Sequence, residues 1–511
     1  MDPLPGKTER NVRPLVVLSL AALVFTLPVI FYGFPVLGHD GRVHLLWHRQ
    51  FSSQFWAGEW YPRWLMGSHD GFGSPTFFFY GPFPFFVTSL LAPLGRLFTG
   101  LPPGYVELGV SAVIALWGSG MAAYLWLRRS CGAAAATVGA LVYLANPYHL
   151  TVDLYMRAAF AEYWSFMWMP LILYFVEGVV RRRRYAVIGL ALSYALLVMT
   201  HLITTVIFSP VPIAYALFLS NRREWARDLL RVGGGLLLGI GLAAIYLFPA
   251  LDHQRYVSAQ RYLLDPVFQW QNNFPPLDGR LLERGESWPS FVQFIAILIL
   301  VAGLAVVCLV SRAGIFWAVV AGASFFMMTP LSAPVWRLLP VLANLQFPWR
   351  YQTVVTVAIS ALAALSFGRR PVWAKSGMVV VGLLWIGFFG RMFFVLSKQD
   401  HNVGWHTTFT EDPFLSAWSS PGAQIVPMDP VRVVSGEGIA SAPCQSARAV
   451  SACHHQGGAL PRPAGATRPS RSTRSEFATA RRNATAPPSE CPMTVVWSSS
   501  SSSRNVGKNS P

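Results

Sequence analysis

The sequence is dominated by apolar runs of close to 20 residues, the length that a helix needs to cross the hydrocarbon core of a bilayer. About eleven such runs lie at residues 14–36, 106–127, 132–149, 163–180, 185–200, 203–220, 232–250, 291–310, 315–329, 350–366 and 377–396. Charged residues make up only 12% of the chain, against about 25% in soluble proteins. This pattern excludes a soluble enzyme, a fibrous protein and a disordered chain. It predicts an all-α polytopic membrane protein.

The distribution of basic residues predicts the orientation of these spans, because short loops rich in Lys and Arg stay in the cytoplasm. The most basic short loops are Arg128–Arg129, Arg181–Arg184, Asn221–Arg231 and Arg369–Lys375. These loops share one side if about eleven segments cross, within a range of 10–12. Residues 1–13 are then cytoplasmic and the C-terminus is extracytoplasmic. We therefore expect a multi-pass membrane protein.

One further apolar run, Thr76–Phe98, would reverse this arrangement if it crossed the bilayer. It contains three prolines and two glycines, and these residues interrupt regular helices. Irregular backbone at membrane depth is tolerated where protein or a wet cavity surrounds it. The run is therefore interpreted as a re-entrant or interfacial segment.

The predicted topology places the long loops on the outer side, where we expect the working face. These outer loops cover about 37–75, 150–162, 251–290 and 330–348, within a transmembrane domain of residues 14–400. Residues 401–440 resemble the first strands of a β-rich extracytoplasmic domain. Residues 441–511 are rich in Ser, Arg, Ala and Pro, a composition that predicts a low-complexity, truncated or disordered tail.

The net charge of +17 does not indicate a nucleic-acid-binding protein. Much of the excess lies in the short loops that orient the spans and in the C-terminal tail. The expected partner is therefore membrane lipid, with no nucleic acid.

The first outer loop contains the densest group of polar residues. A short amphipathic helix after Asp40 would place Asp40, His44 and His48 at positions i, i+4 and i+8, on one face. One interpretation is a catalytic carboxylate supported by histidine. A second is a divalent metal site with Asp40 and His44 as ligands. A third is an interfacial helix whose polar face only meets water.

The second outer loop brings three charged residues, Asp153, Arg157 and Glu162, to the mouth of the helix bundle. Unpaired charges there are costly and usually face a cavity. Arg157 could hold a phosphate bidentately, with Glu162 orienting it or binding a metal. The alternative is a simple salt bridge, since Asp153 and Arg157 are i, i+4 partners.

Two further polar groups interrupt apolar surroundings. His201 follows Thr200 between two apolar runs, and it is interpreted either as a supporting site residue or as the cap of a helix. Arg350 begins the span after the last outer loop, where its charge opposes the helix dipole. This position predicts an anionic partner for Arg350.

Several function classes are excluded by missing motifs. The sequence contains no Walker A loop, dinucleotide fingerprint, HExxH helix or GxSxG elbow. It also contains no internal repeat with broken midplane helices, which many channels and secondary transporters have.

The quoted motifs resemble those of a bacterial membrane family that carries the 6-pyruvoyl-tetrahydropterin synthase-related domain. The resemblance rests on Asp40 with GEWYPRW and GFGSPTFFFYGP, on NPYHLTVDLYMRAAFAE, on Thr200-His201-Leu202 and on FPWR at 347–350. The family is similar in plan to the GT-C superfamily of polyprenol-dependent glycosyltransferases. The resemblance implies a GT-C-like fold over roughly residues 14–400.

The resemblance also implies roles for individual residues. An acidic residue of the first outer loop acts on the acceptor in GT-C enzymes, and Asp40 matches it. A second acidic position corresponds to Asp153 or Glu162. The chain lacks the Asp-x-Asp pair of metal-dependent members, so the expected mechanism requires no cofactor, and a divalent metal stays an alternative.

The expected function is transfer of a sugar from a polyprenyl-phosphate donor to an envelope acceptor on the outer face, with inversion. Asp40 would be catalytic, and Arg157, Arg350 and Glu162 would bind the donor phosphate, with His44, His48, Asp153 and His201 in support. The alternative is a non-catalytic protein, either a flippase for lipid-linked glycans or a scaffold for envelope assembly.

Overall fold

The computed structural model describes residues 12–95, 101, 104–257, 266–274, 311–369, 394, 396–398, 433–435 and 438–440. Contacts divide the chain into two units, Met1–Ala423 and Gln424–Pro511. The predicted span at 291–310, the predicted span at 377–396 except residues 394 and 396, and the predicted tail at 441–511 lie outside the described residues.

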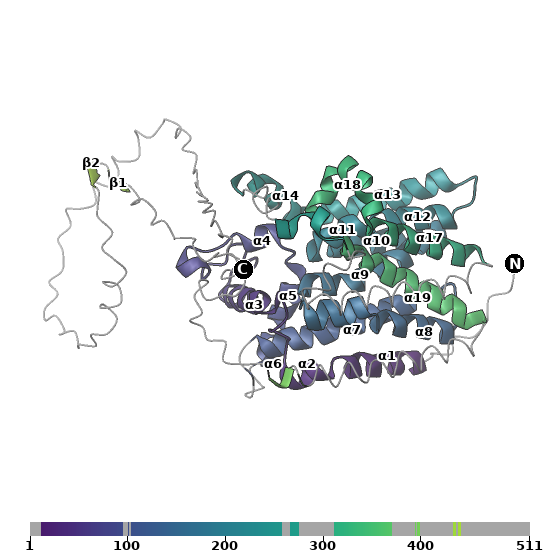
Figure 1. The fold of residues 1–511 in the computed structure, drawn as a ribbon, viewed down its shortest axis with the longest axis horizontal. Coiled ribbons are helices and arrows are strands. Elements are labelled where there is room, and N and C mark those ends of the chain that lie inside the picture. The colour runs from purple at the N-terminus through teal and green to yellow at the C-terminus, as the bar shows by residue number, and fades with distance from the viewer. Residues whose placement is uncertain are drawn as a thin grey trace, which may run out of the picture. The chain divides into compact units, whose positions relative to one another are not determined.

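The first unit is built from apolar helices that run beside one another (Figure 1). They are α1 (Val12–Phe25), α7 (Tyr105–Leu127), α8 (Ala133–Leu144), α9 (Phe160–Val180), α10 (Ala186–Thr200), α11 (Leu202–Phe208), α12 (Pro210–Leu219), α13 (Trp225–Leu242), α14 (Ala244–His253), α17 (Arg312–Met327) and α19 (Gln352–Arg369). Helix α7 packs against α8 and α9, α10 packs against α9 and α13, and α19 packs against α8 and α17. Each of these helices overlaps one of the apolar runs that the sequence predicts to be membrane spans.

Four of the described helices are long and apolar enough to cross a membrane unbroken: Tyr105–Leu127, Phe160–Val180, Leu202–Leu219 and Pro348–Phe367. Two more spans result if each of two bent helix pairs counts as one. These pairs are Trp225–Leu242 with Ala244–Tyr256, bent by 66°, and Arg312–Met327 with Pro330–Leu338, bent by 85°. The described residues therefore provide four to six candidate spans, and the larger number of about eleven stays a prediction.

The proline-rich run at 76–98 does not form one continuous helix. Its described part contains three short helices, α4 (Thr76–Phe79), α5 (Phe83–Leu90) and α6 (Ala92–Gly95). The break after α4 contains Gly81, where an added Cβ would lie 2.0 Å from the carbonyl oxygen of Thr200. Glycine thus allows this segment to cross closely over the end of α10.

Shorter elements gather at the end of the bundle where α9 begins. The first outer loop forms the predicted helix as α3 (Gly41–Trp56), and Figure 1 shows α3 to α6 at one end of the long helices. The remaining short helices are α2 (Leu27–Tyr32), η1 (His69–Gly71), η2 (Tyr148–Met156), η3 (Gln254–Tyr256), η4 (Pro266–Phe268), η5 (Trp270–Asn272), η6 (Pro330–Ser332), α18 (Ala333–Leu338), η7 (Pro340–Leu345) and η8 (Pro348–Tyr351).

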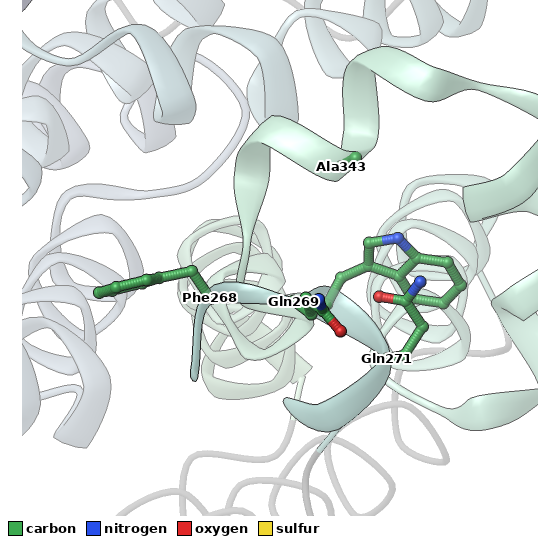
Figure 2. A pocket seen from close by; sticks show the side chains of 5 residues that line it. Phe268, Gln269, Gln271 and Ala343 are labelled. Carbon is green, nitrogen blue, oxygen red and sulfur yellow. The ribbon is translucent and has the colours of Figure 1, made fainter. Parts of the chain in front are cut away.

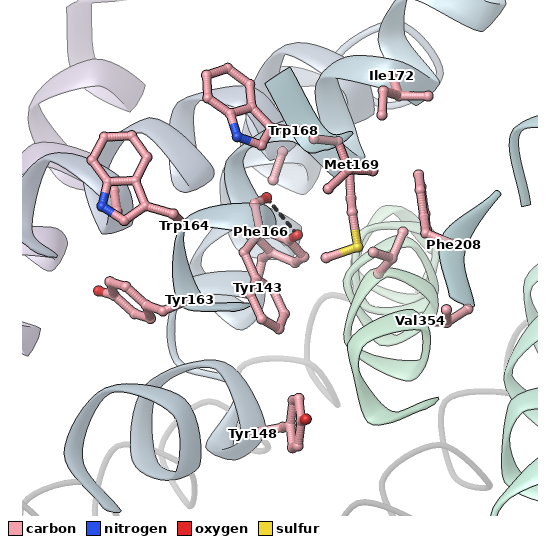
Figure 3. Close-up of a cluster of buried hydrophobic side chains, with 14 of the residues drawn as sticks. Tyr143, Tyr148, Tyr163, Trp164, Phe166, Trp168, Met169, Ile172, Phe208 and Val354 are labelled. Atoms are coloured by element: carbon pink, nitrogen blue, oxygen red, sulfur yellow. Dashed lines mark hydrogen bonds between the residues drawn. The ribbon is translucent and has the colours of Figure 1, made fainter. Parts of the chain in front are cut away.

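The core beneath these elements is unusually aromatic. Figure 3 shows Tyr143 of α8 beside Phe166 of α9, with Tyr163 and Trp164 on another side of α9, and all four are buried. The Tyr143 hydroxyl donates a hydrogen bond to the Phe166 carbonyl oxygen at 2.8 Å. Buried tyrosines need such a partner, and rigid aromatic packing of this kind holds the adjacent polar site in place.

Basic loops lie at the opposite end of the bundle. Arg182 bridges to Asp228 at 2.6 Å and to Glu224 at 3.4 Å. Arg129 lies over the Tyr174 ring at 3.7 Å. The ion pairs of Arg182 join the loops Arg181–Arg184 and Asn221–Arg231, which the charge pattern predicts to share one side.

This arrangement makes a prediction about sidedness. The test uses a chain whose five native cysteines are replaced by serine and into which one cysteine is introduced, by Ala57→Cys or by Asn221→Cys. Position 57 is exposed at the α3 end of the bundle, and position 221 is exposed at the end with the basic loops. A membrane-impermeant thiol reagent added outside intact cells should label position 57 and leave position 221 unlabelled. The reverse labelling pattern would overturn the predicted orientation.

In the second unit, the described residues form one antiparallel pair of strands, β1 (Val433–Ser435) and β2 (Gly438–Ala440). Val434 pairs with Ile439. The pair lies within the segment that the sequence predicts to be β-rich.

Candidate functional site

Two carboxylates and two guanidinium groups form a buried ion network at the α3 end of the bundle. Arg157 Nη1 lies 2.8 Å from Asp153 Oδ1 and 2.9 Å from Glu162 Oε2. The Asp153 side chain is 0% exposed and that of Glu162 is 2% exposed. Buried charges are tolerated when they are paired in this way. The predicted i, i+4 salt bridge between Asp153 and Arg157 is confirmed.

Arg350 joins the network from a distant part of the chain. Its Nε lies 3.7 Å from Glu162 Oε2, and its Nη1 donates a hydrogen bond to the Leu345 carbonyl oxygen at 3.0 Å. The Tyr148 hydroxyl donates to Glu162 Oε1 at 2.6 Å. The anionic partner that the sequence predicts for Arg350 is therefore found inside the protein. Glu162 accepts hydrogen bonds from Tyr148 and Arg157 and forms a longer ion pair with Arg350.

Aromatic rings cover the two guanidinium groups. Arg157 lies over the Trp349 ring at 4.8 Å and Arg350 lies over the Phe347 ring at 4.9 Å. The rings of Phe347 and Trp349 stack on each other with centroids 5.0 Å apart. Cation–π contacts of this kind stabilise cations that are partly removed from water.

The first outer loop attaches directly to the second through backbone hydrogen bonds. The backbone N–H of His39 donates to the Met156 carbonyl oxygen at 3.2 Å, and that of Asp40 donates to the Arg157 carbonyl oxygen at 2.8 Å. These bonds place Asp40 beside the ion network.

A histidine of α3 strengthens this attachment. His44 is 2% exposed, and burial lowers its pKa below the ordinary value of 6.5, so the ring is neutral. Its Nδ1 pairs with the Ala158 carbonyl oxygen at 2.8 Å and its Nε2 pairs with the Tyr80 hydroxyl at 2.9 Å. A carbonyl oxygen only accepts, so Nδ1 carries the proton and Nε2 accepts from Tyr80.

Close backbone approach makes this contact dependent on glycine. A Cβ added at Gly38 would lie 2.8 Å from the Ala158 Cβ, and one at Gly41 would lie 2.4 Å from the Pro35 carbonyl oxygen. Ala158 itself has a φ of 52°, a left-handed conformation that costs a non-glycine residue about 1–2 kcal/mol. Such strain is typical of functional sites.

The three candidate carboxylates differ in their surroundings. Asp153 and Glu162 are buried and ion-paired, whereas Asp40 is half-buried at the N-terminus of α3. The Asp40 carboxylate makes no side-chain cap hydrogen bond to its own helix. Of these three groups, Asp40 is therefore the most accessible to a bound molecule.

Two of the histidines that the sequence predicts to support the site are His201 and His48; the first caps a helix and the second is buried. His201 is the N-cap of α11, where its side chain accepts from the Thr204 backbone N–H and its Nδ1 lies 2.8 Å from the Thr204 hydroxyl. The helix-cap interpretation of His201 is therefore confirmed. His48 lies one helical turn beyond His44 and is 1% exposed.

Buried His48 should make stability depend on pH. Its Nδ1 has no hydrogen-bond partner among the described residues, and burial with the nearby Arg49 charge lowers its pKa from 6.5 to about 3. The unfolded chain binds a proton below about pH 6.5 and the folded chain does not. Stability is therefore complete above that pH and falls below it by up to about 1.4 kcal/mol per pH unit.

Thermal unfolding of the purified protein between about pH 8 and pH 5 measures this effect. The unfolding temperature of the wild type should fall as the pH drops through 6.5. His48→Leu should show a shallower fall, and equal slopes for the two proteins would contradict the assignment.

The metal alternative requires ligands that include Asp40 and His44. Within the described residues, no group of three or more His, Cys, Asp or Glu side chains could hold a metal ion. Both ring nitrogens of His44 have protein partners, so His44 could coordinate a metal only after losing one of them.

The sequence analysis missed three residues of the site, Tyr80, Tyr148 and Trp349. Each lies in a motif that carries the family resemblance, within FFFYGP, NPYH or FPWR. These motifs could therefore have indicated that the three residues belong to the site. Local spacing does not predict which charged group each ring contacts.

No curated protein matches the sequence. The archaeal oligosaccharyltransferase AglB from Archaeoglobus fulgidus, solved with an inhibitory peptide and a dolichol-phosphate, has a TM-score of 0.45 and 12% identity. That match covers 76% of this chain and 55% of the other. The apo oligosaccharyltransferase of that organism has a TM-score of 0.43 and 12% identity, covering 75% and 55%. This chain thus spans about half the length of these proteins.

A family model provides the assignment. The model described as the 6-pyruvoyl-tetrahydropterin synthase related domain of membrane proteins matches residues 77–395. This match covers more than half of the chain and includes Arg157, Glu162 and Arg350. The chain therefore belongs to the membrane protein family that carries the 6-pyruvoyl-tetrahydropterin synthase related domain.

Proposed function

We propose that this protein is a GT-C-type membrane glycosyltransferase that moves a sugar from a polyprenyl-phosphate donor to an envelope acceptor. The reaction takes place on the outer face of a bacterial cytoplasmic membrane, with the N-terminus inside. The observation that carries the proposal is the half-buried Asp40, which is hydrogen-bonded through its backbone to the loop that bears Arg157. A half-buried carboxylate thus lies beside paired cations.

Asp40 acts as the general base. The acceptor oxygen forms a bond to the anomeric carbon while the bond from that carbon to the phosphate oxygen breaks. The acceptor proton passes to the Asp40 carboxylate, and the bonding electrons leave with the lipid phosphate. A single displacement of this kind inverts the anomeric centre. The leaving phosphate is already ionised and requires no general acid.

The arginines stabilise the departing phosphate. Arg157 makes both of its ion pairs through Nη1, so its Nε and Nη2 keep N–H groups that can donate to phosphate oxygens. Arg350 adds a second positive charge in the same partly desolvated region, where such contacts count for more than in water. Asp153 and Glu162 hold these cations in position, and Tyr148 fixes Glu162.

His44 and His201 act as positioning residues. His44 ties the helix that follows Asp40 to the Ala158 carbonyl, and His201 begins the helix that packs against α19 and α9. Neither residue needs to take a proton during the transfer.

The proposal is tested first in cells. Mass spectrometry of lipid-linked sugars and envelope glycans should show, in a strain lacking the protein, a lipid-linked sugar that accumulates and a glycan that loses that same sugar. The wild-type gene should reverse both changes. A glycan lost without any requirement for Asp40 would favour the flippase or scaffold alternative.

A further inference from the structure

A small cavity lies between η4, η5 and η7 (Figure 2). It has a volume of about 200 Å³ and is lined by Phe268, Gln269, Trp270, Gln271 and Ala343. In Figure 2, Ala343 faces the segment that carries Gln269 and Gln271 from across the opening. We call this the Trp270 cavity. It is smaller than the roughly 300–1,000 Å³ of sites for drug-sized ligands, so it has room for one ring and not for a chain.

The lining of the Trp270 cavity suits a neutral, hydroxyl-rich ligand. None of the five lining residues carries a charge, so the cavity lacks the arginine or lysine that a phosphate group requires. The amide of Gln271 provides both donors and an acceptor, which match the dual character of a hydroxyl group. Phe268 and Trp270 provide apolar surface for the C–H faces of a sugar ring.

The aromatic wall of the cavity is rigid before any ligand binds. Trp270 is 6% exposed and stacks on Trp336 with centroids 5.4 Å apart and an interplanar angle of 19°. The Trp336 Nε1–H donates to the Ser332 hydroxyl at 3.0 Å. A preformed wall reduces the ordering cost of binding.

Continuous contacts link the Trp270 cavity to the ion network. The ring of Phe268 lies 6.3 Å from that of Phe347, which stacks on Trp349, and Trp349 lies under Arg157. The other wall belongs to η7, whose Leu345 carbonyl accepts a hydrogen bond from Arg350. Both walls thus adjoin groups that the proposed reaction uses.

We propose that the Trp270 cavity is a binding subsite for one uncharged sugar ring, belonging either to the acceptor glycan or to the lipid-linked donor. This inference rests on the proposed function for the source of the sugar. The subsite holds the saccharide through neutral hydrogen bonds and aromatic contact, while the arginines bind phosphate separately.

Binding of free sugars tests the subsite without any need for turnover. Glucose, mannose and galactose are titrated separately against the purified full-length chain in a detergent without a sugar headgroup. Saturation-transfer NMR and tryptophan fluorescence report binding. At least one hexose should bind saturably to the wild type, and inorganic phosphate should not compete with it.

Two variants and one matched control localise the binding. Gln271→Ala removes a hydrogen-bonding amide and should weaken binding about 3- to 10-fold. Ala343→Phe fills the cavity and should abolish binding. Gln254→Ala makes the same chemical change as the first variant on η3, outside the cavity, and should bind like the wild type. No hexose binding to the wild type, or unchanged binding in both cavity variants, would refute the subsite.

Transfer assays separate this inference from the proposed function. A rise in acceptor KM in Gln271→Ala identifies the acceptor as the source of the sugar, and a rise in donor KM identifies the donor. Hexose binding that depends on Ala343, without any sugar transfer, would retain the subsite and refute the transferase. Sugar transfer with wild-type KM values in both cavity variants would retain the transferase and refute the subsite.

Discussion

Purified Asp40→Asn protein is expected to transfer sugar about 10²–10⁴-fold more slowly than the wild type, which is the usual contribution of a general base. Asparagine has nearly the same size and shape as aspartate but cannot take the acceptor proton. The backbone N–H of residue 40 still donates to the Arg157 carbonyl, so the loop should keep its position. The change is therefore expected in kcat, with donor binding close to that of the wild type.

The same substitution should have little effect on stability. The Asp40 carboxylate is half-buried and does not cap its helix, and substitutions at such positions usually change stability by no more than about 0.5 kcal/mol. The unfolding temperature, measured with and without donor, checks this expectation. A general collapse of the fold would remove both transfer and donor binding, whereas loss of the base removes only transfer.

Asp252→Asn is the matched control for Asp40→Asn. This substitution makes the same chemical change, from a carboxylate to an amide, on α14. The Asp252 side chain is 47% exposed and pairs with Arg255 at 3.7 Å. This variant should transfer sugar at the wild-type rate. Wild-type turnover by Asp40→Asn would show that Asp40 is not the base. Donor binding by the wild type without any turnover would favour the flippase alternative.

Local features of the site could be predicted from the sequence because they depend on residues close together in the chain. The helix after Asp40, the i, i+4 pair of Asp153 with Arg157 and the cap at His201 all follow from short-range spacing. The broken helices between Thr76 and Gly95 follow from proline and glycine in the same way.

The long-range contacts could not be predicted because they depend on how the helices pack. The bond from His44 to Ala158 joins residues 114 positions apart, and no local period indicates it. The pairing of Arg350 with Glu162 likewise requires η8 to meet α9. Hydrophobic periodicity predicts which face of a helix is buried but not which helix covers it. The left-handed Ala158 is also unpredictable, since alanine has no preference for that conformation.

The second large effect is expected at Glu162, through stability. Glu162→Gln leaves Arg157 and Arg350 buried with Asp153 as the remaining carboxylate of the network. Removing one partner of a buried ion pair typically costs about 3–5 kcal/mol, because the remaining charge is uncompensated. The purified variant should therefore unfold several degrees below the wild type, as measured by thermal unfolding in the same detergent.

Asp153→Asn makes the matched change in the same network and should cost much less, about 1 kcal/mol, the net value of one hydrogen bond. Asp153 has one ion-pair partner, and its Oδ2 has no hydrogen-bond partner among the described residues. Burial and the Glu162 charge raise the pKa of the Asp153 carboxyl, so its charged form is less stabilised here than it is in water. A neutral amide at position 153 therefore replaces a carboxylate with one ion-pair partner, whereas Glu162 pairs with both arginines.

A double variant tests whether uncompensated charge causes the loss at Glu162. Arg350→Met in the Glu162→Gln background removes one of the two arginines that Glu162 balances, while the methionine keeps apolar volume beside Phe347. The double variant should be more stable than the sum of the two single effects predicts, because residues in one ion-pair network couple by about 0.5–3 kcal/mol. Strictly additive losses, or a larger loss in Asp153→Asn than in Glu162→Gln, would show that Glu162 is not the residue that balances the two arginines.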